Sequence, residues 1–233
     1  MIGSTARRRL APLGLAWGLA LLSASAGPMP ADTPSALETD PAGWTDLIAE
    51  AGPGLKGWTR ATLHPTDKLA PESQWSVDTE LKVLLCEGNR GHEWLRYDRE
   101  LADFILHAEW KFTPLTAGKK GYNSGIYVRN SADARVWHQA QVGGGPDAFL
   151  FGETLKDEKL VRINLNTKAA DKRVRPAGEW NAVELTCKGK DVDFWVNGGV
   201  VNEWRDCQVP RGFVGLEAEG YRIEFRNVKV KPL

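Results

Sequence analysis

The clearest alternation of hydrophobic and polar positions lies between residues 104 and 130, in the segment FILHAEWKFTPLTAGKKGYNSGIYVRN. Apolar residues alternate with mostly polar ones from Phe104 to Phe112, and this period of two predicts a β-strand with one side facing a core. A second strand is predicted over 124–129, after a connection rich in Gly and Lys. If the two strands are neighbours, Glu109 and Arg129 lie on the same side of one sheet.

Short strands of the same kind recur along the rest of the chain. They are predicted at 75–77, 81–86, 94–97, 136–142, 148–151, 160–165, 180–188, 192–196, 213–217 and 221–230. Turn residues such as Gly and Asn separate many of them, and no segment combines helical periodicity with helix caps. Many short strands at such spacings predict an all-β sandwich. We expect residues 44–233 to form a single domain, because a chain of this length can bury its own core.

The N-terminal residues have the order of a cleavable secretory signal. Arginines at 7–9 precede an apolar run over 10–22, and Ala-Ser-Ala follows at 24–26. The apolar run is short for a membrane span, so we expect residues 1–26 to be removed and the protein to be exported to the periplasm or beyond, with an uncleaved anchor as the alternative. Residues 27–43 are rich in Pro, Ala, Ser and Thr without apolar periodicity, which predicts a flexible tether.

The charge balance argues against a nucleic acid as partner. Lysine plus arginine and aspartate plus glutamate each number 30, and the signal segment contains three arginines but no acidic residue. The remaining chain is therefore slightly acidic, whereas binding to phosphate backbones requires a basic surface. After removal of the signal we expect no membrane contact either.

The three cysteines are Cys86, Cys187 and Cys207. In an exported protein two of them can pair, and we predict a disulfide between Cys187 and Cys207 with Cys86 as a buried thiol. Three free thiols are the alternative, because the spacing of the cysteines is not typical of a metal site.

Four separated segments resemble one protein family. They are 103–129 (DFILHAEWKF to NSGIYVR), 178–189 (GEWNAVELTCKG), 194–203 (FWVNGGVVNE) and 209–233 (VPRGFVGLEAEGYRIEFRNVKVKPL). Together and in this order they closely resemble the family long called domain of unknown function 1080, now named for 3-keto-disaccharide hydrolase, 3-keto-glucoside 1,2-lyase and 3-keto-2-hydroxy-glucal hydratase activity. The resemblance covers residues 44–233. It implies a concanavalin A-like, jelly-roll sandwich of two sheets, exported by bacteria, with a concave sheet that binds sugar.

Two positions depart from the pattern of that family. After NSGIYVR the family usually has a strand of the form E-x-Q-I-x-D, where this chain has HQAQVG at 138–143, so that a Gln takes the acidic place and the last acid is missing. Near the C-terminus many members have Gln and His in G-L-Q-x-H-G, where this chain has Glu217 and Glu219. The chain thus keeps polar side chains at both places, but the acidic residues lie near the C-terminus and not on the strand over 138–143.

Conventional glycoside hydrolysis is disfavoured by the arrangement of acids. It needs two carboxyl groups spaced across the glycosidic bond, and no strand of the form E-x-D-x-x-E is present. Glu217 and Glu219 are the only acidic pair on one face of a strand.

A sugar already oxidised at C3 reacts more easily, because the ketone acidifies the C2 proton, the C1 substituent then leaves by elimination, and water adds back. Such an enzyme needs a base near C2, an electrophile at the C3 oxygen and an acid for the leaving group.

Candidates for these roles lie on the polar sides of the predicted strands. We predict Glu109 or His138 as base, Arg129 or a bound divalent metal ion as electrophile, and Glu217 or Glu219 as acid or ligand. Such an ion would be held by oxygen ligands and one His, although the spacing of these residues along the sequence matches no metal-binding motif. The structural alternative for Glu109 and Arg129 is a cross-strand ion pair.

Further residues suit sugar binding. Gln139 and Gln141 share one face, where amides recognise hydroxyl groups, and alternation places either these two or His138 in the pocket. Asn123 and Ser124 either contact the sugar or only shape the turn. Most of the ten tryptophans should be core, but an exposed ring such as Trp137 can stack on a sugar.

The sequence therefore predicts a secreted enzyme that cleaves 3-keto-glycosides by elimination and hydration, with an oxidised glucoside or disaccharide as partner. A divalent metal ion is the one cofactor that it suggests. A non-catalytic carbohydrate-binding module is the alternative, and a structural or protein-binding sandwich is a third interpretation.

Overall fold

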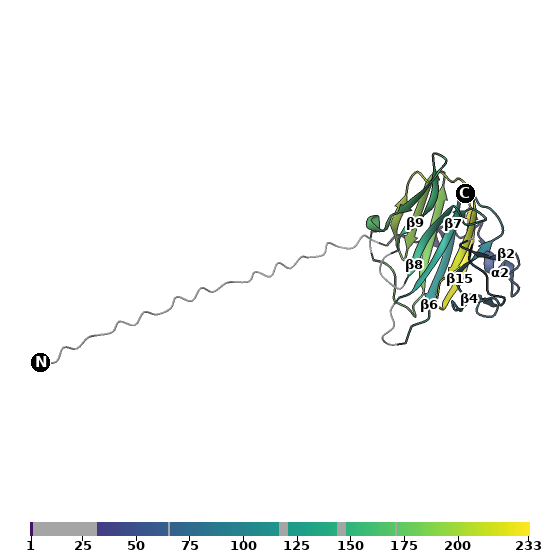
Figure 1. Ribbon diagram of the computed structural model, residues 1–233, viewed down its shortest axis with the longest axis horizontal. Helices are drawn as coiled ribbons and strands as arrows, with labels where there is room; N and C mark the ends of the chain where they lie inside the picture. Colours follow the sequence, from purple (N-terminus) through teal and green to yellow (C-terminus); the bar gives the residue numbers. More distant parts are fainter. Residues whose placement is uncertain (2–31, 65, 117–120, 144–147, 171) are drawn as a thin grey trace. The chain divides into compact units, whose positions relative to one another are not determined.

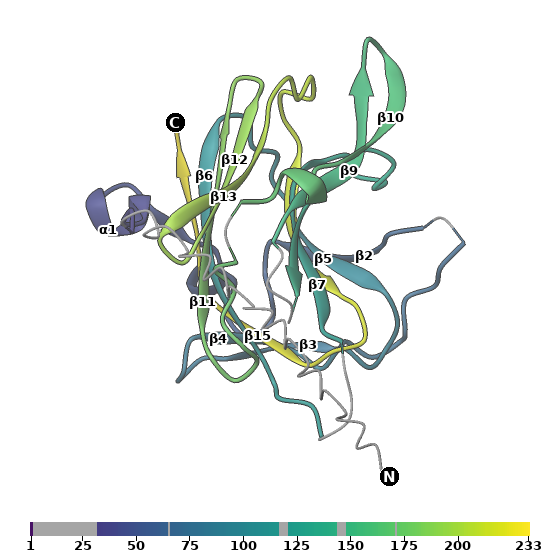
Figure 2. The ribbon, with the colours of Figure 1, turned by 90° about the vertical axis from the view of Figure 1, so that its left-hand side faces the viewer.

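Two antiparallel β-sheets pack face to face in the computed structural model (Figures 1 and 2). Within the described residues, sheet A has eight strands in the order β13-β12-β11-β6-β15-β4-β3, with β1 beside β15. Their bounds are β1 (Thr45–Asp46), β3 (Trp75–Asp78), β4 (Val83–Cys86), β6 (Phe104–Phe112), β11 (Asn181–Lys188), β12 (Asp191–Val196), β13 (Gly199–Trp204) and β15 (Ile223–Pro232). Sheet B has seven strands in the order β10-β9-β8-β7-β14-β5-β2. These are β2 (Trp58–Thr62), β5 (Glu93–Tyr97), β7 (Asn123–Asn130), β8 (Trp137–Gly143), β9 (Leu150–Lys156), β10 (Lys159–Asn164) and β14 (Phe213–Ala218).

The described residues are 1, 32–64, 66–116, 121–143, 148–170 and 172–233. Apart from Met1, the predicted signal segment and residues 27–31 of the predicted tether lie outside them. Helical structure is limited to α1 (Ala36–Thr39), α2 (Leu47–Ala51) and the 3₁₀ turn η1 (Asn166–Lys168) in these ranges. None of the described helices has the length and apolar character needed to cross a membrane.

The core lies between the sheets and is built by the predicted alternation. On β6 the apolar set that begins with Phe104 and ends with Phe112 is buried, whereas Glu109 and Lys111 are partly exposed on the opposite side. Ile126 and Val128 of β7 are fully buried in the same core. The all-β two-sheet sandwich predicted from the sequence is therefore confirmed.

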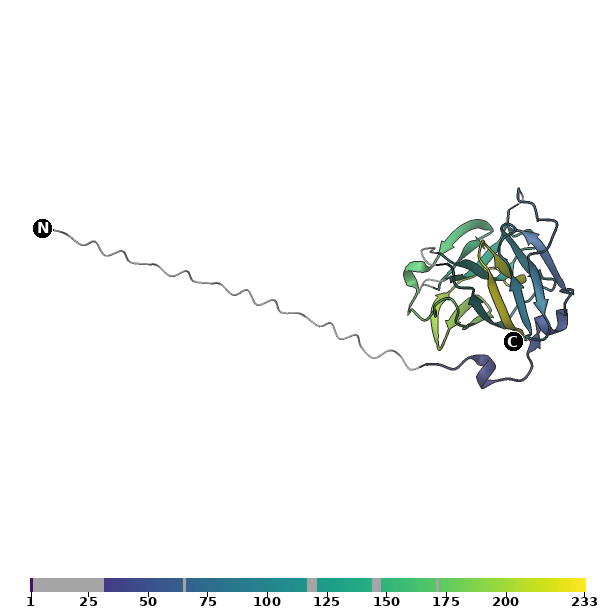
Figure 3. The same cartoon turned by 90° about the horizontal axis from the view of Figure 1, so that it is seen from below.

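Most of the segment assigned to a flexible tether is ordered, and this part of the prediction is wrong. Residues 32–46 run along the outer side of sheet A, with α1 outside the strands (Figures 2 and 3). The Thr33 amide donates to the Gly198 carbonyl at 2.7 Å, and the Trp195 indole donates to the Thr33 carbonyl at 3.0 Å. At the other end, β1 pairs with β15. We call residues 32–46 the N-terminal strap.

A buried carboxylate fastens this strap. Glu184 of β11 accepts hydrogen bonds from the backbone amides of Ala36 at 2.6 Å and Leu37 at 3.0 Å, and from the His107 ring at 3.0 Å. Glu184 and His107 are both buried. The sequence of the strap gives no sign of this docking. The segment has no apolar period, and polar contacts hold it against sheet A.

The predicted disulfide between Cys187 and Cys207 is also wrong. Both residues and Cys86 are free, buried thiols. Burial raises the pKa of Cys86 to about 12 and raises that of Cys187 further, so these thiols stay protonated and inert. They behave as small core residues.

Replacing Glu184 tests how much the N-terminal strap depends on it. Glu184→Ala should lower the free energy of unfolding by about 2 to 4 kcal/mol, because two backbone amides and a buried His lose their acceptor. Hydrogen exchange at Ala36 and Leu37 should accelerate. The matched control is Glu203→Ala, which removes an exposed partner of Arg205 and should change stability by about 0.5 kcal/mol or less. Equal effects of the two substitutions would contradict the assignment.

Candidate functional site

The outer face of sheet B carries a polar patch because β7 and β8 alternate strictly. Tyr127, Gln139 and Gln141 point outward, while Ile126 and Ala140 between them are fully buried in the core. The strands pair so that Tyr127 lies opposite Gln139. Side chains from adjacent strands are thereby brought into contact on one surface.

This surface is hollowed into a cavity of about 630 Å³, a size typical of small-ligand sites. One end is polar and the other is aromatic. The lining residues are Leu63, His64, His92, Asn123, Tyr127, Asp133, Ala134, Arg135, Trp137, Gln139, Gln141, Phe149, Phe151, Glu153, Arg162, Asn164, Glu217 and Glu219.

Glu217 of β14 is the centre of the polar end. Its Oε1 accepts hydrogen bonds from the Tyr127 hydroxyl at 2.5 Å and from the His92 ring at 2.8 Å, and its Oε2 accepts one from the Gln139 amide at 2.7 Å. The carboxylate is buried, and three donors satisfy it. Burial, followed by the charge of Glu217, raises the pKa of Tyr127 well above its usual value, so Tyr127 remains a donor.

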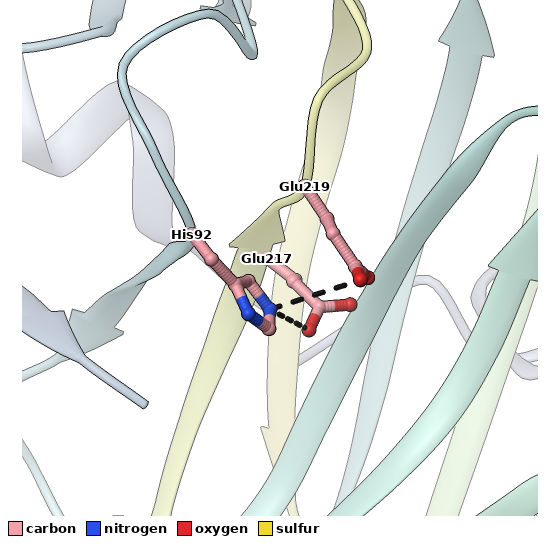
Figure 4. A group of neighbouring side chains, drawn as sticks. All are labelled: His92, Glu217 and Glu219. Atoms are coloured by element: carbon pink, nitrogen blue, oxygen red, sulfur yellow. Dashed lines mark hydrogen bonds and ion pairs between the residues drawn. The ribbon is translucent and has the colours of Figure 1, made fainter. Parts of the chain in front are cut away.

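His92 and Glu219 flank Glu217 (Figure 4). His92 lies just before β5 and Glu219 just after β14, and His92 Nε2 is 4.0 Å from Glu219 Oε2. The hydrogen bond to Glu217 raises the pKa of His92. Burial and then the neighbouring Glu217 charge raise the pKa of Glu219, whose Oε2 accepts a hydrogen bond from Asn123 at 2.5 Å.

These three side chains fit the requirements of a divalent metal ion. One imidazole nitrogen and one oxygen from each carboxylate lie within 4.8 Å of one another. A ring nitrogen with two carboxylates is a donor set that suits ions such as Mn²⁺ or Zn²⁺. A cation between Glu217 and Glu219 would also relieve the repulsion that raises the pKa of Glu219.

The floor of the polar end depends on a glycine. Gly125 lies on β7, and a Cβ atom there would collide with the side chain of Gln139. Because position 125 is bare, the Gln139 amide can cross it to reach Glu217. The neighbouring Gln141 amide reaches Asn123 at 2.5 Å and so joins the same network.

The aromatic end is formed by β8, β9 and β10. Trp137 and Phe151 are almost perpendicular, with ring centroids 5.1 Å apart, and Phe149 lies 5.3 Å from Phe151. The Arg162 guanidinium lies 4.5 Å from the Trp137 centroid and 5.4 Å from that of Phe151. We call Trp137, Phe149, Phe151 and Arg162 the aromatic wall.

With this geometry, comparison with known proteins places the chain in a family. The family model of the 3-keto-alpha-glucoside-1,2-lyase-like domain matches residues 43–231. The chain belongs to this family. Its domain is a carbohydrate-related β-sandwich, and the resemblance seen in the sequence is confirmed.

Solved structures share the fold of this 3-keto-alpha-glucoside-1,2-lyase-like domain at low sequence identity. A Parabacteroides distasonis protein provisionally named a glycosyl hydrolase is 18% identical, with a TM-score of 0.56 over 87% of this chain and 99% of that one. The carbohydrate-binding module CBM66 of Bacillus subtilis is 14% identical, with a TM-score of 0.55 over 75% and 95%. A Bacillus subtilis protein of unknown function with a galectin-like fold is 12% identical, with a TM-score of 0.52 over 81% of this chain and 94% of that one. No curated protein matches the sequence.

In this member of the 3-keto-alpha-glucoside-1,2-lyase-like family, six of the ten predicted site residues line the cavity. They are Asn123, Trp137, Gln139, Gln141, Glu217 and Glu219. Ser124 does not line it, because its buried hydroxyl donates to the Glu217 carbonyl at 2.8 Å. Ser124 thus holds β7 to β14 and does not face a sugar.

The predicted pairing of Glu109 with Arg129 is wrong, because β6 and β7 belong to different sheets. Glu109 lies on the outer side of sheet A, where its carboxylate accepts hydrogen bonds from Arg226 at 2.7 Å and Asn227 at 2.6 Å. Its predicted role as base at the cavity is therefore dropped. The long connection over 113–122 joins the two sheets and not two neighbouring strands.

Arg129 is fully buried and does not reach the cavity, which corrects its predicted role as electrophile. Its backbone has a φ of 52°, close to a register shift in the pairing of β14 with β7. The guanidinium donates to the carbonyls of Ala102 at 2.8 Å and Gly189 at 2.8 Å, and to Asp103 at 2.9 Å. Arg129 therefore ties two distant loops to the end of β7.

His138 faces the core, and Gln139 and Gln141 are therefore the residues of this strand that face the cavity. The prediction of His138 as base is wrong. Its Nδ1 donates to the Val128 carbonyl at 3.1 Å, so Nε2 accepts from the Thr154 hydroxyl at 2.9 Å. Burial lowers the pKa of His138 to about 4, which leaves the ring neutral.

Sequence reasoning missed His92 and Tyr127. Tyr127 could have been found, because it alternates with the core residues Ile126 and Val128 and thus shares a face with the candidates of β8. His92 had no such signal. It follows a turn at 87–91, and its contact with Glu217 depends on the pairing of β5 with β14.

His138 should make stability depend on pH. Its pKa is about 4 in the folded protein and about 6.5 when unfolded, so between these values only the unfolded chain takes up the proton. Wild-type stability should fall on acidification through this window by on the order of 3 kcal/mol from this group. His138→Gln should be less stable at pH 7, and the difference from wild type should shrink towards pH 4 in urea unfolding. Parallel pH profiles would show that another group controls the slope.

Proposed function

We propose that this protein is an exported enzyme that cleaves 3-keto-glycosides by elimination and hydration, at the cavity on the outer face of sheet B. Export is inferred from the basic, apolar and small-residue order of residues 1–26. The single observation that carries the activity is the cluster of His92, Glu217 and Glu219 at the polar end of a cavity large enough for a hexose. Family membership supports the choice of an oxidised sugar.

Glu219 is the best candidate for the base. Glu217 has three donors, whereas Glu219 accepts one hydrogen bond, from Asn123, on its Oε2, and is partly exposed to the cavity. In the proposed elimination, Glu219 Oε1 takes the C2 proton as the bond from C1 to the leaving oxygen breaks and C1=C2 forms. The same carboxyl then returns the proton to the leaving oxygen, and water adds across the double bond.

The other residues of the polar end orient the sugar. The amides of Gln139, Gln141 and Asn123 can donate to and accept from hydroxyl groups, and each is fixed by a neighbour in the network. Glu217 holds His92, Tyr127 and Gln139 in place through its two oxygens. Such preorganisation would hold a substrate within reach of Glu219 without reorganisation during the reaction.

A divalent ion would complete the site, because the sequence candidate for electrophile, Arg129, is in the core. His92 Nε2 and the carboxylates of Glu217 and Glu219 would hold it. When bound, such an ion supplies a positive charge that polarises a carbonyl oxygen.

A non-catalytic carbohydrate-binding role is the second candidate. It is favoured by the aromatic wall, since exposed rings beside amides also suit sugar binding without chemistry. Saturable binding to unoxidised glycans with no product from 3-keto-glycosides would select it.

Glu219→Gln tests the proposed base. With a 3-keto-glucoside that carries a chromogenic leaving group, its rate of aglycone release should fall at least about 100-fold, because the amide cannot take the C2 proton. The matched control is Glu224→Gln, which alters an ion pair with Lys111 on sheet A and should keep the wild-type rate. Thermal unfolding should show that both variants fold. A wild-type rate for Glu219→Gln would remove this residue from the mechanism.

Metal removal tests the ion separately. Dialysis against a chelator should lower the rate at least tenfold, and Mn²⁺ or Zn²⁺ should restore it. Calorimetry should detect binding of the ion to wild type and to His64→Ala, which alters another histidine of the same cavity, but not to His92→Ala. Full activity in protein shown by elemental analysis to be free of metal would rule out the ion and leave the elimination intact.

A further inference from the structure

The aromatic wall has no role in the chemistry proposed above. Trp137, Phe149 and Phe151 are each partly exposed, although large rings are ordinarily buried where they have no ligand. Trp137 lies on β8, Phe151 lies on β9 and Phe149 comes just before β9, and the three rings gather at one end of the cavity. An open cluster of this kind provides a surface for an apolar part of a ligand.

The wall is continuous with the reactive end. The Tyr127 hydroxyl contacts Glu217, and the Tyr127 ring is 6.4 Å from that of Trp137, at an interplanar angle of 83°. Trp137 then meets Phe151 at 5.1 Å. A sugar held at Glu217 and Glu219 would therefore direct one substituent along the wall. If C1 of the sugar faces the wall, this substituent is the leaving group of the elimination.

The polar groups of the wall are engaged with each other. Arg162 and Glu153 form an ion pair at 3.4 Å, and the Arg162 guanidinium lies over the rings of Trp137 and Phe151. Asn164 of β10, which pairs with Phe151, is a further polar side chain of the lining at this end. The two rings stand at 89°, and such a corner accepts a third flat ring that stacks on one and presents its edge to the other.

Arg162 can move to admit this ring. Its side chain is half exposed, and an exposed ion pair and an exposed cation–π contact are both weak. The guanidinium can then cover the outer face of the bound ring, as it covers Trp137 now.

We propose that the aromatic wall is the leaving-group subsite and that it selects a planar aryl group over a second sugar. This inference rests on the proposed function for its meaning in catalysis, but the binding preference can be measured without turnover. Trp137 is the specificity-determining residue, and Arg162 is the mobile cap.

The binding experiment compares phenyl and methyl α-glucosides, neither oxidised, by calorimetry. Wild type should bind the phenyl compound at least tenfold more tightly. Trp137→Ala should abolish that preference, whereas Trp137→Phe should keep part of it because a flat ring remains. The matched control is Trp180→Ala, which removes a tryptophan between Lys111 and Arg226 on sheet A and should keep the full preference.

The turnover experiment uses 3-keto-glucosides with phenyl or glucosyl leaving groups. The ratio of kcat/KM values, phenyl over glucosyl, should fall at least tenfold from wild type to Trp137→Ala. The intrinsic reactivity of the two leaving groups cancels in this comparison. Turnover with an unchanged ratio would overturn the subsite and leave the proposed function standing. A phenyl preference in binding without turnover would support the subsite and contradict the proposed function. Neither binding nor turnover of phenyl glucosides would overturn the subsite.

Discussion

The two-residue alternation of sheet B is the constraint on which both stability and the site depend. On β8, alternate residues must face the core and the cavity, so His138 and Ala140 point towards sheet A while Gln139 and Gln141 point towards the cavity. A slip of one residue would exchange the two sets. It would place amides in the core and remove the donor that Gln139 gives to Glu217. The strand register that builds the core therefore also assembles the polar network.

Much of this arrangement follows from local sequence. The apolar period of β6 and the turn residues between short strands are enough to predict a sandwich, since each acts over a few residues. The same reasoning predicts that Gln139 and His138 point to opposite faces of their strand, but it does not show which of them faces the core. Glu217 and Glu219 were identified from a departure in the family pattern, and both line the cavity.

The remaining features depend on contacts between distant residues. Nothing in β6 or β7 indicates that they belong to different sheets, so the pairing of Glu109 with Arg129 could not be judged. A positive φ at Arg129 turns its side chain from the expected face into a set of loop carbonyls. His92 meets Glu217 across 125 residues, and the N-terminal strap is held by polar contacts that leave no periodic pattern.

Gly125 shows how a position without a functional group can govern chemistry. It has no side chain to bind a substrate or move a proton, yet the reach of the Gln139 amide to Glu217 depends on the Cβ atom that it lacks. Any larger residue would push the Gln139 amide away from Glu217. Natural or engineered diversity in ligand choice is therefore expected at the aromatic wall, whereas position 125 should remain invariant wherever this buried amide is kept.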